Sequence, residues 1–263
     1  MSFLPAPLEP VRPAFLTRVA PVTRLAAGAI WLVAALLTVD PAVPAALLVA
    51  GLLALVLISG LPLGRLPARL APLLIAAVGI AILTVLFHPS TGDPVARRLV
   101  EIGPLRITEA ALSAGLALAL RLAVVAVTSV LVFGPSDETR FADSLVQQWR
   151  LSDRVAYGSL AALRIAPQLA VDWSATGAVR RLRGIEPGGP IDRIRTLGGR
   201  ILTLLVSSIR RAGRMALAMD ARGFDSGVRR SRFRPIRIGQ LDWLLIGGAL
   251  LVAIAALLVG RVL

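Results

Sequence analysis

The feature that most constrains this chain is a set of five apolar runs, each bounded by proline, glycine or charged residues. The runs cover residues 25–39, 44–61, 70–87, 110–133 and 241–260. A helix needs about 20 apolar residues to cross a bilayer, and the first two runs are at or below that length, so we expect them to form a tight or tilted hairpin. With 56% hydrophobic residues and a mean hydropathy of +0.79, the pattern predicts an all-α polytopic membrane protein with about five transmembrane helices.

The charge of the chain is strongly positive and is carried by arginine alone. There are 29 basic residues and 15 acidic ones, for a net charge of +14, and no lysine is present. In a membrane protein such an excess indicates cytoplasmic loops and anionic lipid headgroups as partners rather than nucleic acid, and no nucleic-acid-binding motif accompanies it.

The distribution of arginines predicts the orientation of the chain in the membrane. With the amino terminus in the cytoplasm, most arginines that flank the runs fall inside: Arg18, Arg24, Arg65, Arg69 and the whole region 134–240. Three arginines, Arg97, Arg98 and Arg106, then lie outside, and they are outnumbered. Residues 1 to 24 show no apolar core followed by a cleavage site, so we expect no cleavable signal peptide.

Three regions follow from these patterns. Residues 1–133 are expected to hold an amino-terminal tail and transmembrane helices 1–4, residues 134–240 a set of cytoplasmic coupling helices, and residues 241–263 the last transmembrane helix. The middle region carries 19 of the 29 arginines, interleaved with leucine and alanine at helical spacing. It is too apolar for a solvated loop, so its apolar faces must be buried against the region itself, the membrane or another chain.

A long helix over Ile191–Phe224 dominates this middle region. Small or apolar residues recur in it at spacings of four and three, which predicts one stripe along the helix: Ile201, Leu205, Ser208, Ala212, Met215 and Met219. Gly223 follows the last of them and favours a left-handed cap, which leaves Arg222 at the tip.

A second helix ends in the same way. The segment from about Gln168 to Arg183 is followed by Gly184 and then by the breakers Pro187, Gly188, Gly189 and Pro190. An arginine in a last helical turn can simply complement the helix dipole. Two consecutive helices that both end in Arg-Gly instead favour a binding role for these arginines. If the helices cross or run antiparallel, the two arginines lie far apart and can contact two separate sites.

The sequence offers little that could carry catalysis or bind a cofactor or metal. There is no cysteine, no Gly-rich phosphate loop with lysine, and no paired histidines or carboxylates at a useful spacing. The only histidine, His88, ends the third run and is interpreted as an interfacial residue. We therefore expect a non-catalytic subunit without a resident cofactor or metal site.

Arg121 is the one charged residue inside the fourth run. A charged side chain within a membrane is costly and is a functional candidate by default. Three interpretations stay open at this stage, namely snorkelling to the interface, pairing with a carboxylate of another helix, and direct contact with a substrate.

Taken together, these residues resemble the transmembrane T component of energy-coupling factor transporters, which are bacterial importers of vitamins and of nickel or cobalt ions. The resemblance covers about nine-tenths of the chain and is densest from Ile102 onward. It rests on the following stretches: Ile102 to Thr108, Arg121, Ser136 to Glu138, Phe141 to Leu145, Ala162 to Pro167, Leu182-Arg183-Gly184, Arg211 to Phe224 with Ala221-Arg222-Gly223, and Asp242-Trp243.

One stretch and two single positions depart from the family pattern. The stretch before the first run reads Ala20-Pro21-Val22-Thr23-Arg24 where the family usually has an Asp-Pro-Arg-Thr-Lys-like sequence. Leu182 stands where alanine is common, and Ile165 where an aromatic residue is usual. The two Arg-Gly ends are unaffected by these departures.

The resemblance implies a division of labour and a location in the bacterial cell membrane. Two cytoplasmic ABC ATPase subunits hydrolyse ATP, a small membrane S subunit binds the substrate, and the T subunit joins them. By similarity the ATPase-coupling residues are Leu182, Arg183, Gly184, Ala221, Arg222 and Gly223. Structural or S-subunit contacts are expected from Arg121, Arg164, Pro167, Arg211 and Arg214.

Two other classes of protein remain as alternatives. A permease or channel subunit would move a solute through its own spans and would need polar groups along the path, where Arg121 is almost the only candidate. A membrane enzyme acting on lipids would need a constellation of carboxylates or histidines, which the sequence does not show. The sequence does not identify the transported substrate, because the binding pocket of such an importer belongs to another chain.

Overall fold

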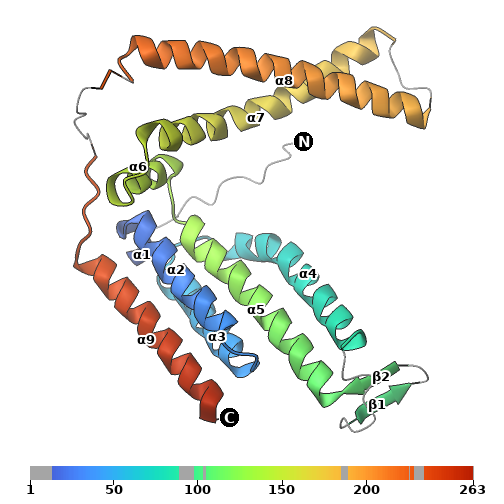
Figure 1. Ribbon diagram of the computed structural model, residues 1–263, viewed down its shortest axis with the longest axis vertical. Helices are drawn as coiled ribbons and strands as arrows, with labels where there is room; N and C mark the ends of the chain where they lie inside the picture. The colour runs from blue at the N-terminus through green and yellow to red at the C-terminus, as the bar shows by residue number, and fades with distance from the viewer. Residues whose placement is uncertain are drawn as a thin grey trace. The chain divides into compact units, whose positions relative to one another are not determined.

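The computed structural model describes residues 14–88, 98–102, 105–184, 189–224, 226–227 and 234–262. Helices dominate it, and one two-stranded hairpin interrupts them (Figure 1). In chain order the elements are α1 (Phe15–Arg18), α2 (Pro21–Leu36), α3 (Ala42–Leu57), η1 (Leu63–Arg65), α4 (Leu66–Leu86), β1 (Arg98–Ile102), β2 (Leu105–Thr108), α5 (Glu109–Phe133), α6 (Glu138–Gln148), α7 (Asp153–Leu182), α8 (Pro190–Ala221) and α9 (Gln240–Val262).

These elements form two compact units, which we call the membrane bundle and the helix pair. The membrane bundle contains α1 to α6 with the hairpin and α9, and the helix pair consists of α7 and α8. The region 134–240, which we predict to be the coupling region, therefore contributes α6 to the bundle and α7 and α8 to the pair.

The apolar runs of the sequence are helices of the membrane bundle. Within the described residues, α4, α5 and α9 are long and apolar enough to cross a bilayer, whereas α2 and α3 are shorter apolar helices of 16 residues each. At 1.5 Å per residue each of these two spans about 24 Å, which is less than the roughly 30 Å of a hydrocarbon core. The expected all-α polytopic membrane protein is confirmed, with the short first two helices as its unusual part.

Helix α5 lies at the centre of the bundle and packs against α2, α3 and α4. Its buried positions are rich in small residues, including Ala111, Gly115, Ala117, Ala123 and Ala126. A side-chain carbon at Gly115 would lie 2.5 Å from Val85 and 3.0 Å from the carbonyl oxygen of Ala81 on α4. Small residues thus let α4 and α5 approach closely, which is how helices gain packing energy where both are surrounded by lipid tails.

Polar side chains tie the helix ends at one end of the bundle. The buried carboxylate of Asp242 accepts hydrogen bonds from the backbone amides of Ala20 and Gly239, both at 2.8 Å, and so joins the beginnings of α2 and α9. The buried Ser144 hydroxyl of α6 accepts a hydrogen bond from the Val22 amide at 3.2 Å. Deeper in the bundle, Trp31 Nε1 donates to the Ala249 carbonyl at 3.1 Å.

The chain leaves and re-enters the bundle at nearly one point. Gln147, near the end of α6, accepts a hydrogen bond through its Oε1 from the backbone amide of Ile236 at 2.8 Å. Ile236 lies shortly before α9, so the side chain of Gln147 joins the residues that precede and follow the helix pair in the sequence.

An antiparallel hairpin precedes α5. Glu101 pairs with Arg106 and Ile102 with Leu105, with an irregularity between Arg98 and Val100. We predicted no strand here, because residues 95–108 lie between two apolar runs and are polar and amphipathic. The Gly103-Pro104 dipeptide between two runs with alternating apolar residues is the signal that points to a hairpin.

The helix pair begins earlier than its sequence pattern suggests. Helix α7 starts at Asp153, where the hydroxyl of Ser152 accepts a hydrogen bond from the Val155 amide at 3.4 Å. The expected start near Gln168 is wrong, because α7 continues through Pro167. A proline removes one hydrogen bond from a helix, and here enough helix lies on either side of Pro167 to keep the two halves continuous.

Candidate coupling site

The two predicted Arg-Gly ends have the same backbone conformation. Gly184 and Gly223 have φ angles of +68° and +74°, in the left-handed region that glycine adopts without a steric penalty. The amide of Gly184 donates to the Arg181 carbonyl at 3.0 Å, and the amide of Gly223 donates to the Asp220 carbonyl at 2.9 Å. The predicted glycine caps are therefore confirmed, and each arginine is the C-cap residue directly after the last residue of its helix.

The end of α8 carries a second capping bond. The Phe224 amide donates to the Met219 carbonyl at 3.0 Å, which together with the Gly223 bond makes a Schellman motif. Such a motif satisfies terminal carbonyls within the helix itself. The guanidinium of Arg222 is therefore not required for capping and is available for other contacts.

All six residues of the two ends are exposed at the surface of the chain: Leu182, Arg183, Gly184, Ala221, Arg222 and Gly223. Leu182 is 88% exposed although it is a large apolar residue. An arginine beside an exposed apolar or small residue is a composition suited to a protein partner rather than to solvent alone.

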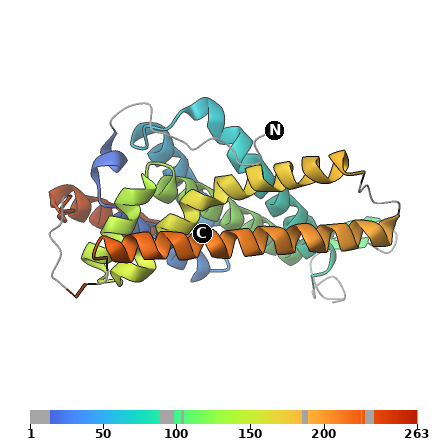
Figure 2. The ribbon, with the colours of Figure 1, turned by 90° about the horizontal axis from the view of Figure 1, so that it is seen from above.

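Contacts along the pair show that α7 and α8 run antiparallel and cross (Figures 1 and 2). Tyr157 near the start of α7 meets Phe224 beyond the end of α8, with ring centroids 6.4 Å apart. Near the other end, Arg180 donates to the Thr196 carbonyl at 3.3 Å. The stretch of α7 between Tyr157 and Arg183 then holds the two arginine ends roughly 40 Å apart.

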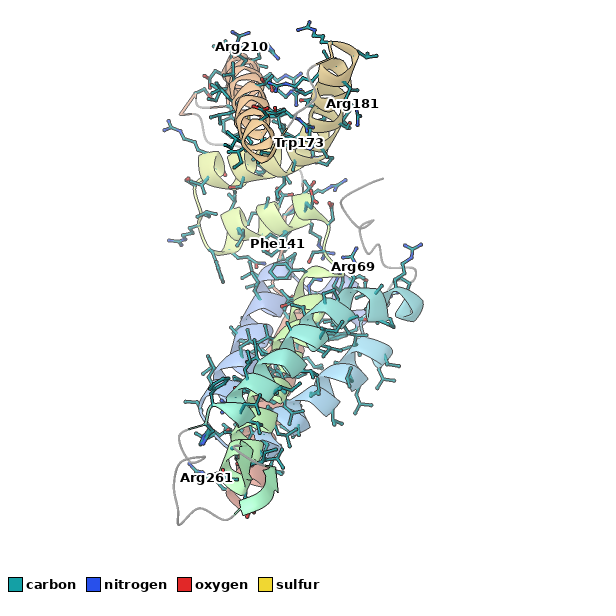
Figure 3. All side chains as sticks on the ribbon, turned by 90° about the vertical axis from the view of Figure 1, so that its right-hand side faces the viewer. Arg69, Phe141, Trp173, Arg181, Arg210 and Arg261 are labelled. Atoms are coloured by element: carbon teal, nitrogen blue, oxygen red, sulfur yellow. The ribbon has the colours of Figure 1, made fainter. Side chains whose placement is uncertain are left out.

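Arginines of each helix bridge the space to the other. The guanidinium of Arg200 lies 3.9 Å from the ring centroid of Trp173 and donates to the Trp173 carbonyl at 2.7 Å. Arg211 pairs with Asp172 at 2.9 Å. Figure 3 shows Trp173 between the helices, and the exposed Arg181 and Arg210 on the same two helices. Cation–π contact and ion pairing therefore hold the pair together where apolar packing is thin.

The predicted stripe of α8 is correct for three of its six residues. Ser208, Met215 and Met219 are partly buried, whereas Ile201 and Leu205 are 53% and 54% exposed and Ala212 is exposed too. Arg200, Leu204 and Arg211 take the inward positions instead. Periodicity alone missed this because the cations, which it assigns to solvent, are the residues that contact α7.

The other candidate residues fall in different places. Arg164 and Pro167 are exposed on α7, and Arg214 is exposed on α8. Arg211 is engaged with Asp172 inside the pair. Arg164, Pro167 and Arg214 thus lie on the surface of the helix pair, and Arg211 lies between its helices.

Arg121 belongs to the other unit, in α5 of the membrane bundle. Its Nε donates to the Ala35 carbonyl at 2.9 Å, and its Nη2 donates to the Thr38 carbonyl. Both carbonyls lie at the end of α2, so Arg121 satisfies a helix terminus within the bundle. This arrangement gives no support to direct contact with a substrate or to the permease alternative.

Residues 14–233 of this chain match the model of the family described as CbiQ, cobalt transport protein. The chain belongs to the CbiQ family. The match begins at α1 and ends before α9, so it includes the whole helix pair and all of the membrane bundle except α9.

Curated relatives of this CbiQ family member agree with that assignment. The chain is 28% identical over 200 residues to the energy-coupling factor transporter transmembrane protein EcfT of Thermosediminibacter oceani, which covers 73% of each chain. It is 30% identical over 158 residues to the protein of the same name from Lacticaseibacillus paracasei, covering 56% of this chain and 60% of that one.

A third relative is much longer. The chain is 29% identical over 196 residues, 71% of its own length, to a putative ABC transporter ATP-binding protein of Bifidobacterium longum, and the match covers 24% of that protein. The CbiQ-like chain thus spans about a quarter of this relative.

Proposed function

We propose that this chain is the transmembrane T subunit of an energy-coupling factor importer. In this role it transmits the motion of two cytoplasmic ABC ATPases to a small membrane S subunit that binds a vitamin or a transition-metal ion. The observation that carries the proposal is the pair of equivalent exposed Arg-Gly ends, which a crossed antiparallel helix pair holds roughly 40 Å apart.

Each arginine end is suited to a groove on one ATPase. A guanidinium makes charge-assisted hydrogen bonds to carboxylates or carbonyls, and these are stronger than bonds between neutral groups. Backbone hydrogen bonds cap both helices, so the guanidinium groups of Arg183 and Arg222 keep their hydrogen-bond donors for the partner. ATP hydrolysis belongs to the partner subunits in this proposal. The relative named as an ABC transporter ATP-binding protein supports the association, because a stretch similar to this chain occurs within it.

The exposed apolar surface of α8 supports the second partnership. In the helix pair no described side chain of α8 is buried, and its large apolar residues are widely exposed: Ile194, Leu202, Ile209 and Leu217 lie between 61% and 71%. A contiguous apolar surface of this kind indicates a protein or membrane partner. We assign it to the S subunit, whose movement would follow that of the helices.

We place the α6 end of the bundle on the cytoplasmic side of the bacterial cell membrane, with the amino terminus inside. Arg69 lies at this end, whereas Arg261 lies at the other (Figure 3). The loops that join the helices at this end carry the larger number of arginines, which is the arrangement that the positive-inside rule favours.

Charge reversal at the two ends tests the proposal. The full chain would be purified with its ATPases and small membrane protein after Arg183→Glu and Arg222→Glu substitutions, made singly and together. A buried contact that loses its cation and gains an anion costs several kcal/mol. Each single variant should therefore lower ATPase recovery at least tenfold, and the double variant should abolish substrate uptake.

Arg210→Glu is the matched control, because it reverses an exposed arginine in the middle of α8. It should leave ATPase recovery and uptake within twofold of the wild-type values. Normal recovery and uptake in the double variant would overturn the proposal and return both arginines to a role at helix ends.

A further inference from the structure

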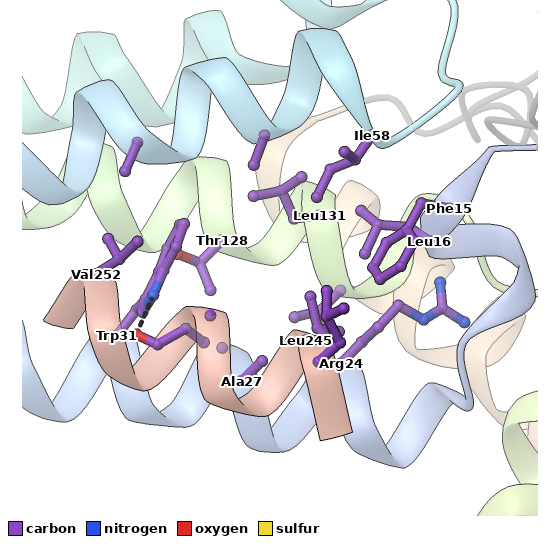
Figure 4. A pocket seen from close by; sticks show the side chains of 17 residues that line it. Phe15, Leu16, Arg24, Ala27, Trp31, Ile58, Thr128, Leu131, Leu245 and Val252 are labelled. Atoms are coloured by element: carbon purple, nitrogen blue, oxygen red, sulfur yellow. Dashed lines mark hydrogen bonds between the residues drawn. The ribbon is translucent and has the colours of Figure 1, made fainter. Parts of the chain in front are cut away.

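The membrane bundle contains an apolar pocket of about 400 Å³ at its α6 end (Figure 4). Residues of α1, α2, α3, α5 and α9 line it, among them Leu16, Ala54, Leu131 and Leu245. Its volume falls in the range of roughly 300–1,000 Å³ that is usual for small-molecule sites. Nothing in the function proposed above makes use of it.

The pocket is lined by a buried arginine without a partner. Arg24, in the first turn of α2, is 2% exposed, and its Nε and both Nη atoms have no hydrogen-bond partner among the residues that the structure describes. A buried cation without compensation is among the most costly arrangements in a folded protein. The five donors of this guanidinium therefore indicate an anionic ligand that completes the site.

The charged groups that act on Arg24 do not supply that anion. Asp242 and Arg140 are the neighbours that interact with it electrostatically. The carboxylate of Asp242 accepts backbone hydrogen bonds from Ala20 and Gly239, and Arg140 donates to the carbonyls of Thr17 and Arg18. Two arginines against one aspartate leave a net positive charge at this end of the pocket.

A second unpaired polar group lines the pocket one turn deeper. Within the described part of the chain, the buried hydroxyl of Thr128 has no hydrogen-bond partner. It lies at the level of Gly28, where an added side-chain carbon would meet Thr128 Cγ2 at 3.0 Å. Gly28 follows Arg24 by one helical turn, or about 5.4 Å. Beyond Thr128 the lining is apolar as far as Trp31 and Val252.

This order of groups matches one class of ligand. A phospholipid has a phosphate near the membrane surface, which needs several hydrogen-bond donors. A few ångströms deeper its ester carbonyl accepts one hydrogen bond, and its acyl chain below needs apolar surroundings. The pocket is also accessible from the bilayer side, because Leu244 and Gly248 of α9 line it and are exposed.

We infer that this pocket is a binding site for one acidic phospholipid. Arg24 binds the phosphate, the Thr128 hydroxyl donates to an ester carbonyl, and one acyl chain lies between α2, α5 and α9 along Trp31 and Val252. The site belongs to the membrane bundle alone, so the inference does not depend on the coupling function proposed for the helix pair.

Native mass spectrometry of the full chain in detergent tests the head-group contact. Phosphatidylglycerol and phosphatidylcholine with the same acyl chains are titrated separately. The wild-type protein should retain one phosphatidylglycerol with at least tenfold preference over phosphatidylcholine, and Arg24→Gln should reduce that preference to less than twofold. Arg18→Gln, which removes an exposed arginine of α1 outside the pocket lining, should leave it unchanged.

Two adjacent glycines of α9 test the acyl-chain contact without touching Arg24. Gly248 lines the pocket and Gly247 does not, and a side-chain carbon at either position meets no atom within 4 Å. Gly248→Leu should lower retention of both lipids at least fivefold by filling the pocket, whereas Gly247→Leu should not.

Three results would overturn the inference. One is equal retention of both lipids by the wild-type protein, and another is full preference in the Arg24→Gln variant. The third is a combination of two observations: the wild-type protein retains neither lipid, and the Arg24→Gln variant loses the small membrane protein on purification. Arg24 would then bind a protein partner and not a lipid. If Arg24→Gln fails to fold, the comparison of Gly248→Leu with Gly247→Leu still decides whether the pocket holds a lipid chain.

Discussion

The membrane bundle and the helix pair differ in how many apolar side chains they bury. The bundle has two clusters of buried apolar residues, around Leu131 and around Val124, and its helices approach through small side chains. In the pair only Ala156 and Leu160 of α7 are buried among the described residues, and no described residue of α8 is. A structure with so little core is not stabilised mainly by its own apolar packing. The bundle therefore has a core of its own, whereas the apolar side chains of the pair are left largely exposed.

The polar contacts of the two units differ in the same sense. In the bundle, buried side chains such as Asp242 satisfy backbone groups at helix ends, where an unpaired donor would be costly. In the pair, Arg200 and Arg211 reach across to α7 from partly exposed positions. Substitutions in the bundle should therefore affect folding, and those in the pair should affect partner binding.

The largest effect on stability is expected from Asp242→Ala. The change removes the acceptor of the Ala20 and Gly239 amides, of which that of Ala20 belongs to a buried residue, and with it the link between α2 and α9, at a cost of about 2–4 kcal/mol. Thermal unfolding of the purified full chain in detergent would measure it. Asp220→Ala, at an exposed position of α8, is the control and should leave the unfolding temperature unchanged. A wild-type unfolding temperature for Asp242→Ala would contradict the role given to this carboxylate.

A smaller effect on the bundle is expected from Gly115→Leu. The new side chain would meet Val85 and the Ala81 carbonyl and push α4 away from α5, which typically costs about 1–3 kcal/mol. Gly79→Leu on α4 is the matched control, because a side-chain carbon at Gly79 meets no atom within 4 Å. Equal unfolding temperatures for the two variants would show that the helices are less closely packed than described.

The smallest effect is expected from Arg211→Gln in the helix pair. Arg211 and Asp172 are 27% and 33% exposed, and a pair of this kind contributes about 0.3–1 kcal/mol. The unfolding temperature should barely change, while hydrogen exchange near Asp172 should become severalfold faster. Arg210→Gln, on an exposed neighbour, should alter neither measurement. If Arg211→Gln lowered the unfolding temperature by several degrees, the Arg211–Asp172 ion pair would contribute to the stability of the fold. The helix pair would then not differ from the bundle in this respect.

The sequence predicts the bundle better than the pair, for a physical reason. Apolar runs define membrane helices directly, so α4, α5 and α9 begin and end within a few residues of the runs at 70–87, 110–133 and 241–260. The glycine caps at Gly184 and Gly223 are equally local, because a left-handed residue after a periodic segment depends on its own backbone.

Features that depend on contacts between distant residues were missed. Nothing near Trp173 in the sequence indicates that Arg200 will cover its ring, and periodicity assigns Arg211 to solvent although it pairs with Asp172. The two unpaired groups of the pocket, Arg24 and Thr128, are far apart in sequence, and only the packing of α2 against α5 brings them to one cavity. The roles of Arg183 and Arg222 toward ATPases remain predictions.

The hydrogen bond between Gln147 and Ile236 has a consequence for how such proteins diversify. It brings the two chain crossings that flank α7 and α8 to a single narrow neck, which is the geometry in which an inserted segment can be exchanged with little disturbance to its host. The helix pair is therefore open to exchange as one segment, with the membrane bundle left as it is. A chimaera joined at this neck, with the pair of one relative in the bundle of another, should fold and take its ATPase preference from the donor of the pair.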